Sequence, residues 1–208
     1  MSKLSPEFYI RSDVVLIARE LLGKLLLTRF NGMVTGGIII ETEAYAGTSD
    51  RASHAYNWRR TKRTEIMYHQ GGVAYVYLCY GIHHLFNIVT NVKDTPHAIL
   101  IRAIKPSIGI EVILQRRKKN SVDPNLIVGP GTVTQALGIL TSHTGTDLTG
   151  DLIWLEDIGI TIPDEKIEVG PRVGVSYAGE DAIKPWRFQL TNNSSVLTGG
   201  MKDEWEKN

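Results

Sequence analysis

An Asn-Gly pair between two apolar runs constrains the fold of this chain more than any other feature of its sequence. Asn31-Gly32 separates Leu25–Phe30 from the longer run Met33–Glu43. Asparagine and glycine both tolerate positive φ, which makes the pair the strongest short-range signal for a tight β-hairpin. We therefore expect two antiparallel strands, the second of which ends in the polar sequence Glu41-Thr42-Glu43.

Other apolar runs bounded by turn-forming residues predict further short strands. They are Val73–Leu78, Leu85–Thr90, Ile99–Ile104, Leu152–Leu155, Ile167–Val169, Arg172–Val175 and Trp186–Leu190. Between the first two of these, Tyr80-Gly81 is predicted to be the turn of a second hairpin.

Three segments are predicted to be helices. A Ser-Asp pair before apolar residues spaced at i, i+3, i+4 and i+7 indicates a capped helix from Val14 to near Gly23. Pro106 is a favourable first helical residue and predicts a helix to about Lys119, and a short helix is expected over Thr132–Leu137. Because strands outnumber helices and hairpins connect them, we expect a single α+β domain over residues 1–208, with a curved, mostly antiparallel β-sheet flanked by helices.

Composition excludes several classes of protein. Of 208 residues, 42% are hydrophobic and 22% charged, which is typical of a globular domain rather than a disordered or coiled-coil chain. No apolar run approaches the ~20 residues that cross a bilayer, and the N-terminus lacks the layout of a secretory signal. A lone cysteine, Cys79, suits a reducing compartment. We expect a cytoplasmic protein, nucleoid-associated in a bacterium, with no membrane partner.

Charge is unevenly distributed although the net charge is only +1. Five basic and no acidic residues lie between Arg51 and Arg63, and a second basic segment runs from Arg102 to Lys119. Such islands could form a phosphate-binding face, although runs of charge are more often simply a solvated surface.

Glu41 and Glu43 are the first candidates for chemistry. Residues two apart on a strand share one face, so both carboxylates are expected to point the same way, beside Tyr45. Carboxylates at a strand end can act as a general base or as an electrostatic partner. An ordinary solvated strand end is the alternative.

Aromatic residues gather at the second predicted hairpin. Tyr75 and Tyr77 share one strand face, and Tyr80 lies at the tip. Strand tyrosines commonly pack in a core, but an exposed ring at a hairpin tip near a basic loop is suited to wedging between stacked bases. Rings beside it could stack on an extruded base.

Motifs for other chemistries are missing. The sequence has no Gly-x-Gly-x-x-Gly after a strand, no Walker-type loop, no Gly-x-Ser-x-Gly and no zinc-ligand spacing. His83-His84 would point to opposite faces of a strand and could not chelate one ion together. The residues therefore support neither a metal enzyme nor a nucleophilic hydrolase.

Taken together, these segments resemble the alkyladenine (3-methylpurine) DNA glycosylase family from about Leu4 to Phe188. The matching segments are Glu41–Tyr45, His54, Tyr75–Gly81, Asn87, Arg102-Ala103, Gly129–Gly131, Thr134–Gly138, Gly170–Val175, Tyr177–Glu180 and Pro185–Phe188. The resemblance implies a β-hairpin protruding toward DNA and a monofunctional glycosylase acting on duplex DNA with damaged purines.

The resemblance also implies roles for individual residues. Glu43 matches the general base that activates water, and Arg102 matches a residue near this carboxylate and the DNA backbone. The residues that match the base-binding pocket are Tyr45, His54 and Tyr77 as an aromatic sandwich, Ala52 as a backbone contact, and Asn87 as a residue that disfavours the 2-amino group of guanine. Those that match DNA contacts are Tyr80, which intercalates, and Thr61, Arg63 and Met67 in the loop that meets the strand backbone.

The implied reaction starts with a flipped 3-methyladenine, 7-methylguanine, hypoxanthine or ethenoadenine and ends with hydrolysis of its N-glycosidic bond. No lysine occupies a motif position that could form a Schiff base, so base removal without strand cleavage is expected. No metal, cofactor or obligate protein partner is expected, and the chain is expected to be a monomer. Thr132 stands where the family usually has a phosphate-contacting lysine. A non-catalytic nucleic-acid-binding module and a hydrolase of free nucleosides are the alternatives.

Overall fold

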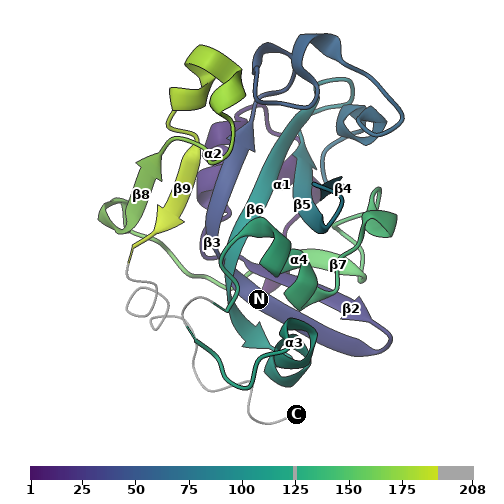
Figure 1. Ribbon diagram of the computed structural model, residues 1–208, viewed down its shortest axis with the longest axis vertical. Coiled ribbons are helices and arrows are strands. Elements are labelled where there is room, and N and C mark those ends of the chain that lie inside the picture. The colour runs from purple at the N-terminus through teal and green to yellow at the C-terminus, as the bar shows by residue number, and fades with distance from the viewer. Residues whose placement is uncertain (124–125, 192–208) are drawn as a thin grey trace.

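A nine-stranded antiparallel sheet organises the computed structural model, within the residues that it describes, 1–123 and 126–191 (Figure 1). Its strands are β1 (Ser2–Lys3), β2 (Leu25–Phe30), β3 (Met33–Tyr45), β4 (Ala74–Cys79), β5 (His83–Thr90), β6 (His97–Ile108), β7 (Ile153–Asp157), β8 (Ile167–Gly170) and β9 (Arg187–Leu190). The main order is β1-β7-β2-β3-β6-β5-β4, and β8 and β9 form a branch that joins β3. The expected α+β class and antiparallel sheet are confirmed. The expected domain of residues 1–208 also includes 124–125 and 192–208, which lie outside the described residues.

Strand β3 is the centre of this sheet. Its first half pairs with β2, in the hairpin predicted from Asn31-Gly32, and its last residues pair with β9 instead. Strand β6 lies along the other side of β3 through bulges near Gly36 and Glu41. Because β6 and β9 flank the end of β3 on both sides, Glu41 and Glu43 lie in a central strand and not at a solvated strand end.

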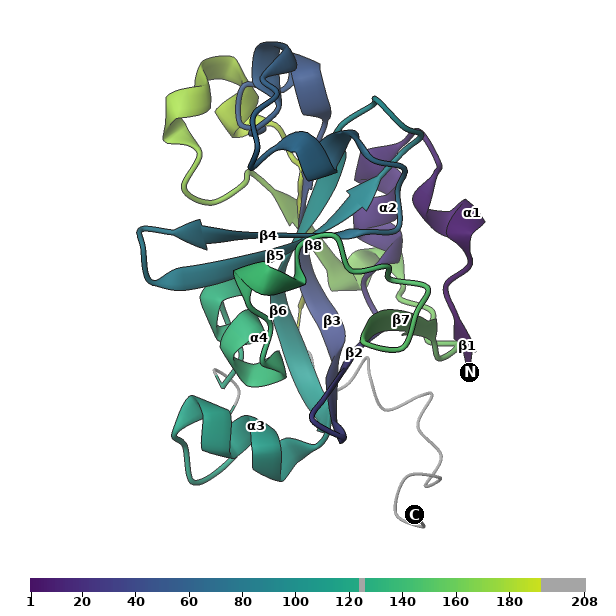
Figure 2. The same cartoon turned by 90° about the vertical axis from the view of Figure 1, so that its right-hand side faces the viewer.

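Helices cover both faces of the sheet (Figure 2). They are α1 (Pro6–Tyr9), α2 (Val14–Glu20), α3 (Ile110–Arg117) and α4 (Pro130–Leu137), with short 3-10 segments over Gly47–Ser49, Tyr56–Trp58, Glu65–Tyr68, Thr141–His143, Asp164–Lys166 and Ser176–Ile183. Helix α2 packs on one face of β3 and β6, and α4 packs on β5 and β6 from the other. The Thr42 hydroxyl donates to the Ala18 carbonyl of α2 at 2.7 Å, so the alternating neighbours Glu41 and Glu43 point to the opposite face.

The β4–β5 hairpin protrudes from the body of the molecule (Figure 2). Tyr80 and Gly81 have φ of 51° and 74°, the left-handed backbone that a tight turn requires. The predicted turn is therefore confirmed. No helix within the described ranges is long and apolar enough to cross a membrane.

The predicted helix start at Pro106 is wrong. Strand β6 continues to Ile108, Pro106 pairs with Gly37, and the pairing shifts at the neighbouring bulge. Proline is tolerated at a bulge because the ladder there lacks a hydrogen bond. Glycine is needed opposite it, since a Cβ on Gly37 would lie 2.6 Å from the Lys105 carbonyl oxygen. Helix α3 begins only at Ile110.

The predicted strand Arg172–Val175 is also wrong, because the segment forms a loop. Its polar groups form hydrogen bonds that are not those of a strand ladder. The Val173 N–H donates to the Glu43 carboxylate, and the Arg172 guanidinium is buried against Asp50.

Candidate active site

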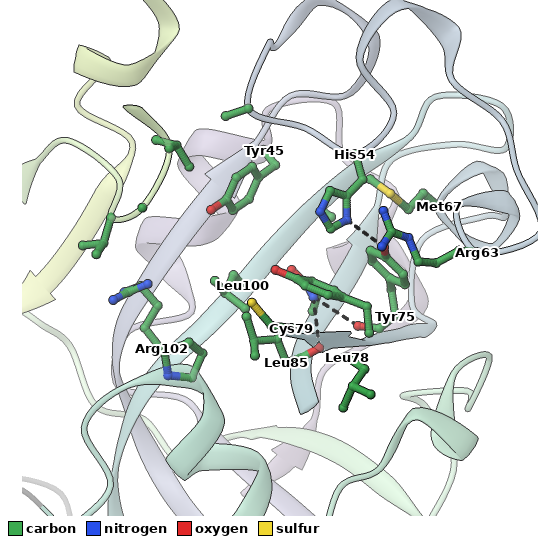
Figure 3. Close-up of a pocket in the computed structure, with 18 of the residues that line it drawn as sticks. Tyr45, His54, Arg63, Met67, Tyr75, Leu78, Cys79, Leu85, Leu100 and Arg102 are labelled. Carbon is green, nitrogen blue, oxygen red and sulfur yellow. Dashed lines mark hydrogen bonds between the residues drawn. The ribbon is translucent and has the colours of Figure 1, made fainter. Parts of the chain in front are cut away.

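A pocket of about 520 Å³ opens beside the protruding hairpin (Figure 3). Its walls come from the end of β3, the loop 47–64, the β4–β5 hairpin, β6 and the loop after β8. The predicted site residues that line it are Tyr45, Ala52, His54, Arg63, Met67, Tyr77, Tyr80, Asn87 and Arg102. Segments far apart in the sequence therefore bring most of the predicted site together.

Glu43 lies directly behind this wall, and its side chain has no exposed surface. Its Oε2 accepts the Tyr45 hydroxyl at 2.8 Å, and its Oε1 accepts the Val173 N–H at 2.7 Å. Arg102 Nη1 lies 3.3 Å from Oε1. These three partners line the pocket, whereas Glu43 itself does not.

The pKa of Glu43 is raised, with burial as the largest cause, although Arg102, Val173 and Tyr45 each lower it. Glu41 raises the pKa further by like-charge repulsion. A carboxylate whose proton affinity is increased in this way is a better general base than an exposed one.

Tyr45 is held from behind by a buried cation. The Arg172 guanidinium lies 4.8 Å from the Tyr45 ring centroid and 5.0 Å from that of Trp186. Arg172 and Asp50 form a bidentate ion pair in which neither side chain is exposed. Asp50 also accepts the Ala52 N–H at 3.0 Å. One ion pair thus fixes both a ring and a backbone segment of the pocket.

His54, Tyr75 and Tyr77 form an aromatic wall. His54 Nδ1 and the Tyr75 hydroxyl are 2.8 Å apart, and the His54 and Tyr77 rings meet edge-on at 4.6 Å between centroids. Burial, together with Arg63 and Arg59, lowers the pKa of His54 to about 4, so its ring is neutral at physiological pH. Figure 3 shows Tyr45 and His54 next to the same cavity, each coming from a different segment of chain.

Tyr75 is a site residue that the sequence singled out only as one of two rings on a strand face, without a role of its own in the pocket. It lines the pocket, is 2% exposed and anchors His54. Burial raises the pKa of Tyr75 to about 12, which keeps its hydroxyl protonated. Its alternation with Tyr77 on one strand was the available signal, but the hydrogen bond to a loop histidine could not be inferred from it.

Asn87 is buried in the pocket floor. Its Nδ2 donates to the carbonyls of Tyr75 and Leu85, at 3.2 and 3.3 Å, so the amide has a fixed orientation. Ala52 is also buried, and its carbonyl accepts the Tyr177 hydroxyl at 3.3 Å.

The predicted DNA-contacting residues occupy different environments. Tyr80 is 93% exposed at the hairpin tip, and Arg63 lies on the exposed side of the pocket. Met67 is 1% exposed and forms part of the pocket wall. Thr61 is exposed outside the pocket and its N–H donates to Thr64. Of these four predicted residues, Tyr80, Arg63 and Thr61 thus present a surface to a large ligand, whereas Met67 does not.

Thr132, the departure from the family pattern, lies in the first turn of α4. Its hydroxyl donates to the Gly129 carbonyl at 2.7 Å. Its neighbour Pro130 lines the pocket, so this helix start is near the site. Across the described residues, no group of three or more His, Cys, Asp or Glu side chains is arranged to hold a metal ion.

Comparisons with known proteins identify the family of this chain. A family model described as methylpurine-DNA glycosylase matches residues 7–194. A protein of Chlamydia felis named "Putative 3-methyladenine DNA glycosylase" is 45% identical over 92% of this chain and 98% of its own length. A protein of Bacillus cereus with the same name is 43% identical over 92% of this chain and 97% of its own. The chain therefore belongs to the methylpurine-DNA glycosylase family.

Proposed function

We propose that this protein removes damaged purines from duplex DNA by hydrolysing the N-glycosidic bond, with Glu43 as the general base. The substrates proposed are 3-methyladenine, 7-methylguanine, hypoxanthine and ethenoadenine. The observation that carries the proposal is the Glu43 carboxylate, buried directly behind an aromatic pocket and held by three groups of the pocket wall. Membership of a DNA glycosylase family supports it independently.

The target nucleotide must leave the duplex before it can enter the pocket. Flipping costs a few kcal/mol of pairing and stacking, and less where damage has weakened the pair. Tyr80 offsets part of this cost by filling the vacated space, since base–aromatic stacking contributes about 1–3 kcal/mol per base. Tyr45, His54 and Tyr77 then receive the purine, and a cationic alkylated base gains further attraction from the tyrosine rings.

Breaking the N-glycosidic bond builds positive charge on the sugar. The Glu43 carboxylate stabilises this charge and accepts a proton from the attacking water, as in glycoside hydrolysis. Arg102, beside it, is placed to orient the carboxylate. No lysine is among the described residues that line the pocket, which supports base removal without a Schiff base or strand cleavage.

We also propose that the protein acts as a monomer without an obligate protein partner. Light scattering alone and with a short duplex tests this directly. A stable dimer whose disruption abolished activity would contradict it.

Release of a damaged base from duplex DNA tests the proposed reaction. Duplexes carrying one hypoxanthine or one ethenoadenine are incubated with the wild type and Glu43→Gln, and abasic sites are revealed by alkali. We expect alkali-dependent nicks with the wild type, none without alkali, and none with Glu43→Gln although it still binds the duplex. A module without catalysis would release no base, and a nucleoside hydrolase would turn over free inosine instead.

A further inference from the structure

Glu41, which does not line the pocket, is connected to Glu43 through a shared arginine. Arg102 Nε donates to Glu41 Oε1 at 2.8 Å, whereas Arg102 Nη1 lies 3.3 Å from Glu43 Oε1. A second cation, Arg187 of β9, reaches the same Glu41 oxygen at 3.1 Å. Arg187, Glu41, Arg102 and Glu43 thus form a row of alternating charges across three strands.

We propose that Glu41 is a positioning residue that holds the Arg102 guanidinium by Nε, so that Glu43 receives only part of its positive charge and remains a base. This inference rests on the proposed role of Glu43 as the general base. Glu41 does not line the pocket, and it acts entirely through Arg102 and its own charge.

The distances determine which carboxylate Arg102 favours. The closer contact, with hydrogen-bond geometry, is to Glu41, and Glu41 is only 3% exposed, so the pair is little screened by solvent. An arginine paired with a single carboxylate usually lowers its pKa by about 1–3 units. If Arg102 paired with Glu43 alone, the base would lose most of the proton affinity that burial gives it.

Arg187 completes the arrangement because it limits the hold of Glu41 on Arg102. It stands opposite Glu43 in the β3–β9 register but forms its ion pair with Glu41. Without Arg187, Glu41 would have Arg102 as its remaining partner in this row and would draw it further from Glu43. Changes at Glu41 and Arg187 should therefore move the pKa of Glu43 in opposite directions.

The charged and titratable groups around Glu43 are Glu41 and Tyr45 on β3, Tyr77 on β4, Arg102 on β6, Arg187 on β9, and Arg172 and Tyr177 in the segments after β8. Apart from Glu41 and Arg187, which are changed one at a time, both variants retain all of these groups, so the expectation is unchanged.

The test measures the pKa of Glu43 in Glu41→Gln and Arg187→Met. An NMR titration of glutamate carboxyl carbons, assigned with Glu43→Gln, reports it without any need for activity. We expect Glu41→Gln to lower this pKa by about one unit and Arg187→Met to raise it, because a neighbouring charge typically acts on this scale. The acid limb of the pH profile of single-turnover base release should shift with the pKa of Glu43. On that limb the rate at a given pH should change about tenfold for each unit of pKa change.

Glu168→Gln is the matched control, because Glu168 is an exposed glutamate on β8, beside β9, and should leave the pKa of Glu43 unchanged. An unchanged or raised pKa in Glu41→Gln overturns the proposal. If that variant does not fold, Arg187→Met decides alone, and an unchanged or lowered pKa overturns the proposal. A wild type that releases no base contradicts the proposed function, while the titration still reports on Glu41.

Discussion

The Tyr45 hydroxyl donates a 2.8 Å hydrogen bond to Oε2 of Glu43, so a ring that lines the pocket is tied directly to the carboxylate behind it. Both residues come from the end of β3, two positions apart and on the same face. Stacking and proton transfer, in the proposed reaction, therefore depend on one short segment of chain.

Tyr45→Phe should shift the pH dependence of base release without removing the ring. The Tyr45 hydrogen bond lowers the pKa of Glu43, so its loss should raise that pKa, by about one unit if the bond contributes the ~1.5 kcal/mol typical of a charged acceptor. Glu43 must be deprotonated to act as a base, so the acid limb moves to higher pH. Single-turnover rates across the acid limb measure the shift.

Tyr45→Leu is the matched variant, because it removes both the hydrogen bond and the aromatic face. We expect it to show the same shift and, in addition, a plateau rate lower by about 10- to 100-fold from lost stacking. An acid limb that moves to lower pH in Tyr45→Phe would contradict the role of this hydrogen bond.

The hairpins and the strand positions of Glu41 and Glu43 could be predicted because they depend on local chemistry. Asn31-Gly32 specifies a turn whatever surrounds it, and the two-residue period places both carboxylates on one face. Pro106 was wrongly predicted to begin a helix. A proline is tolerated within strand β6 because of a bulge in its pairing with β3, and this bulge cannot be inferred from the local sequence. Arg172–Val175 was wrongly predicted to be a strand because its bonding partners are distant in sequence. The Arg172 side chain binds Asp50 and the Val173 N–H donates to Glu43, each more than 100 positions earlier.

Tyr80→Ala should leave the fold intact and slow base release from duplex DNA. The ring is 93% exposed, so its truncation should change the free energy of unfolding by less than about 0.5 kcal/mol. Loss of one stacking contact predicts a decrease of about 10- to 100-fold in excision from duplex. A single-stranded substrate has no vacated stack to fill, so its excision should change much less.

Ile82→Ala controls for the loss of apolar surface at the same tip, because Ile82 is 71% exposed but carries no ring. We expect it to behave nearly as the wild type. An equal decrease on single-stranded and duplex substrates in Tyr80→Ala would show that the ring does not act by stacking in the duplex.

His54 should make the protein less stable as the pH falls. Its folded pKa of about 4 lies below the ordinary value of 6.5, so the unfolded chain binds an extra proton between these values. The resulting loss of stability begins as the pH falls below about 6.5 and is complete near 4. His54→Gln should lessen the loss between about pH 7 and pH 4.5 by about 2 kcal/mol, measured by urea unfolding.

His69→Gln is the control for this prediction, because His69 is exposed in a neighbouring segment and should keep the pH dependence of the wild type. A His54→Gln variant with the same dependence as the wild type would mean that His54 does not resist protonation in the fold.

Asp50 and Arg172 should each stabilise the fold only while the other charge is present. Neither side chain is exposed, so Asp50→Asn leaves an uncompensated buried guanidinium and should cost about 3–5 kcal/mol of unfolding free energy. Arg172→Met should be similarly damaging. The double variant removes both charges, so its cost should be smaller than the sum of the two single costs, with a coupling energy of about 2 kcal/mol or more by urea unfolding.

Asp151→Asn is the control, because it removes the exposed Lys3–Asp151 pair and should leave the free energy of unfolding unchanged. Arg172→Met and the double variant should also slow base release, because in both of them Tyr45 loses the cation behind its ring. Strictly additive costs would instead mean that Asp50 and Arg172 are stabilised by separate partners, and that the pocket wall does not depend on their contact.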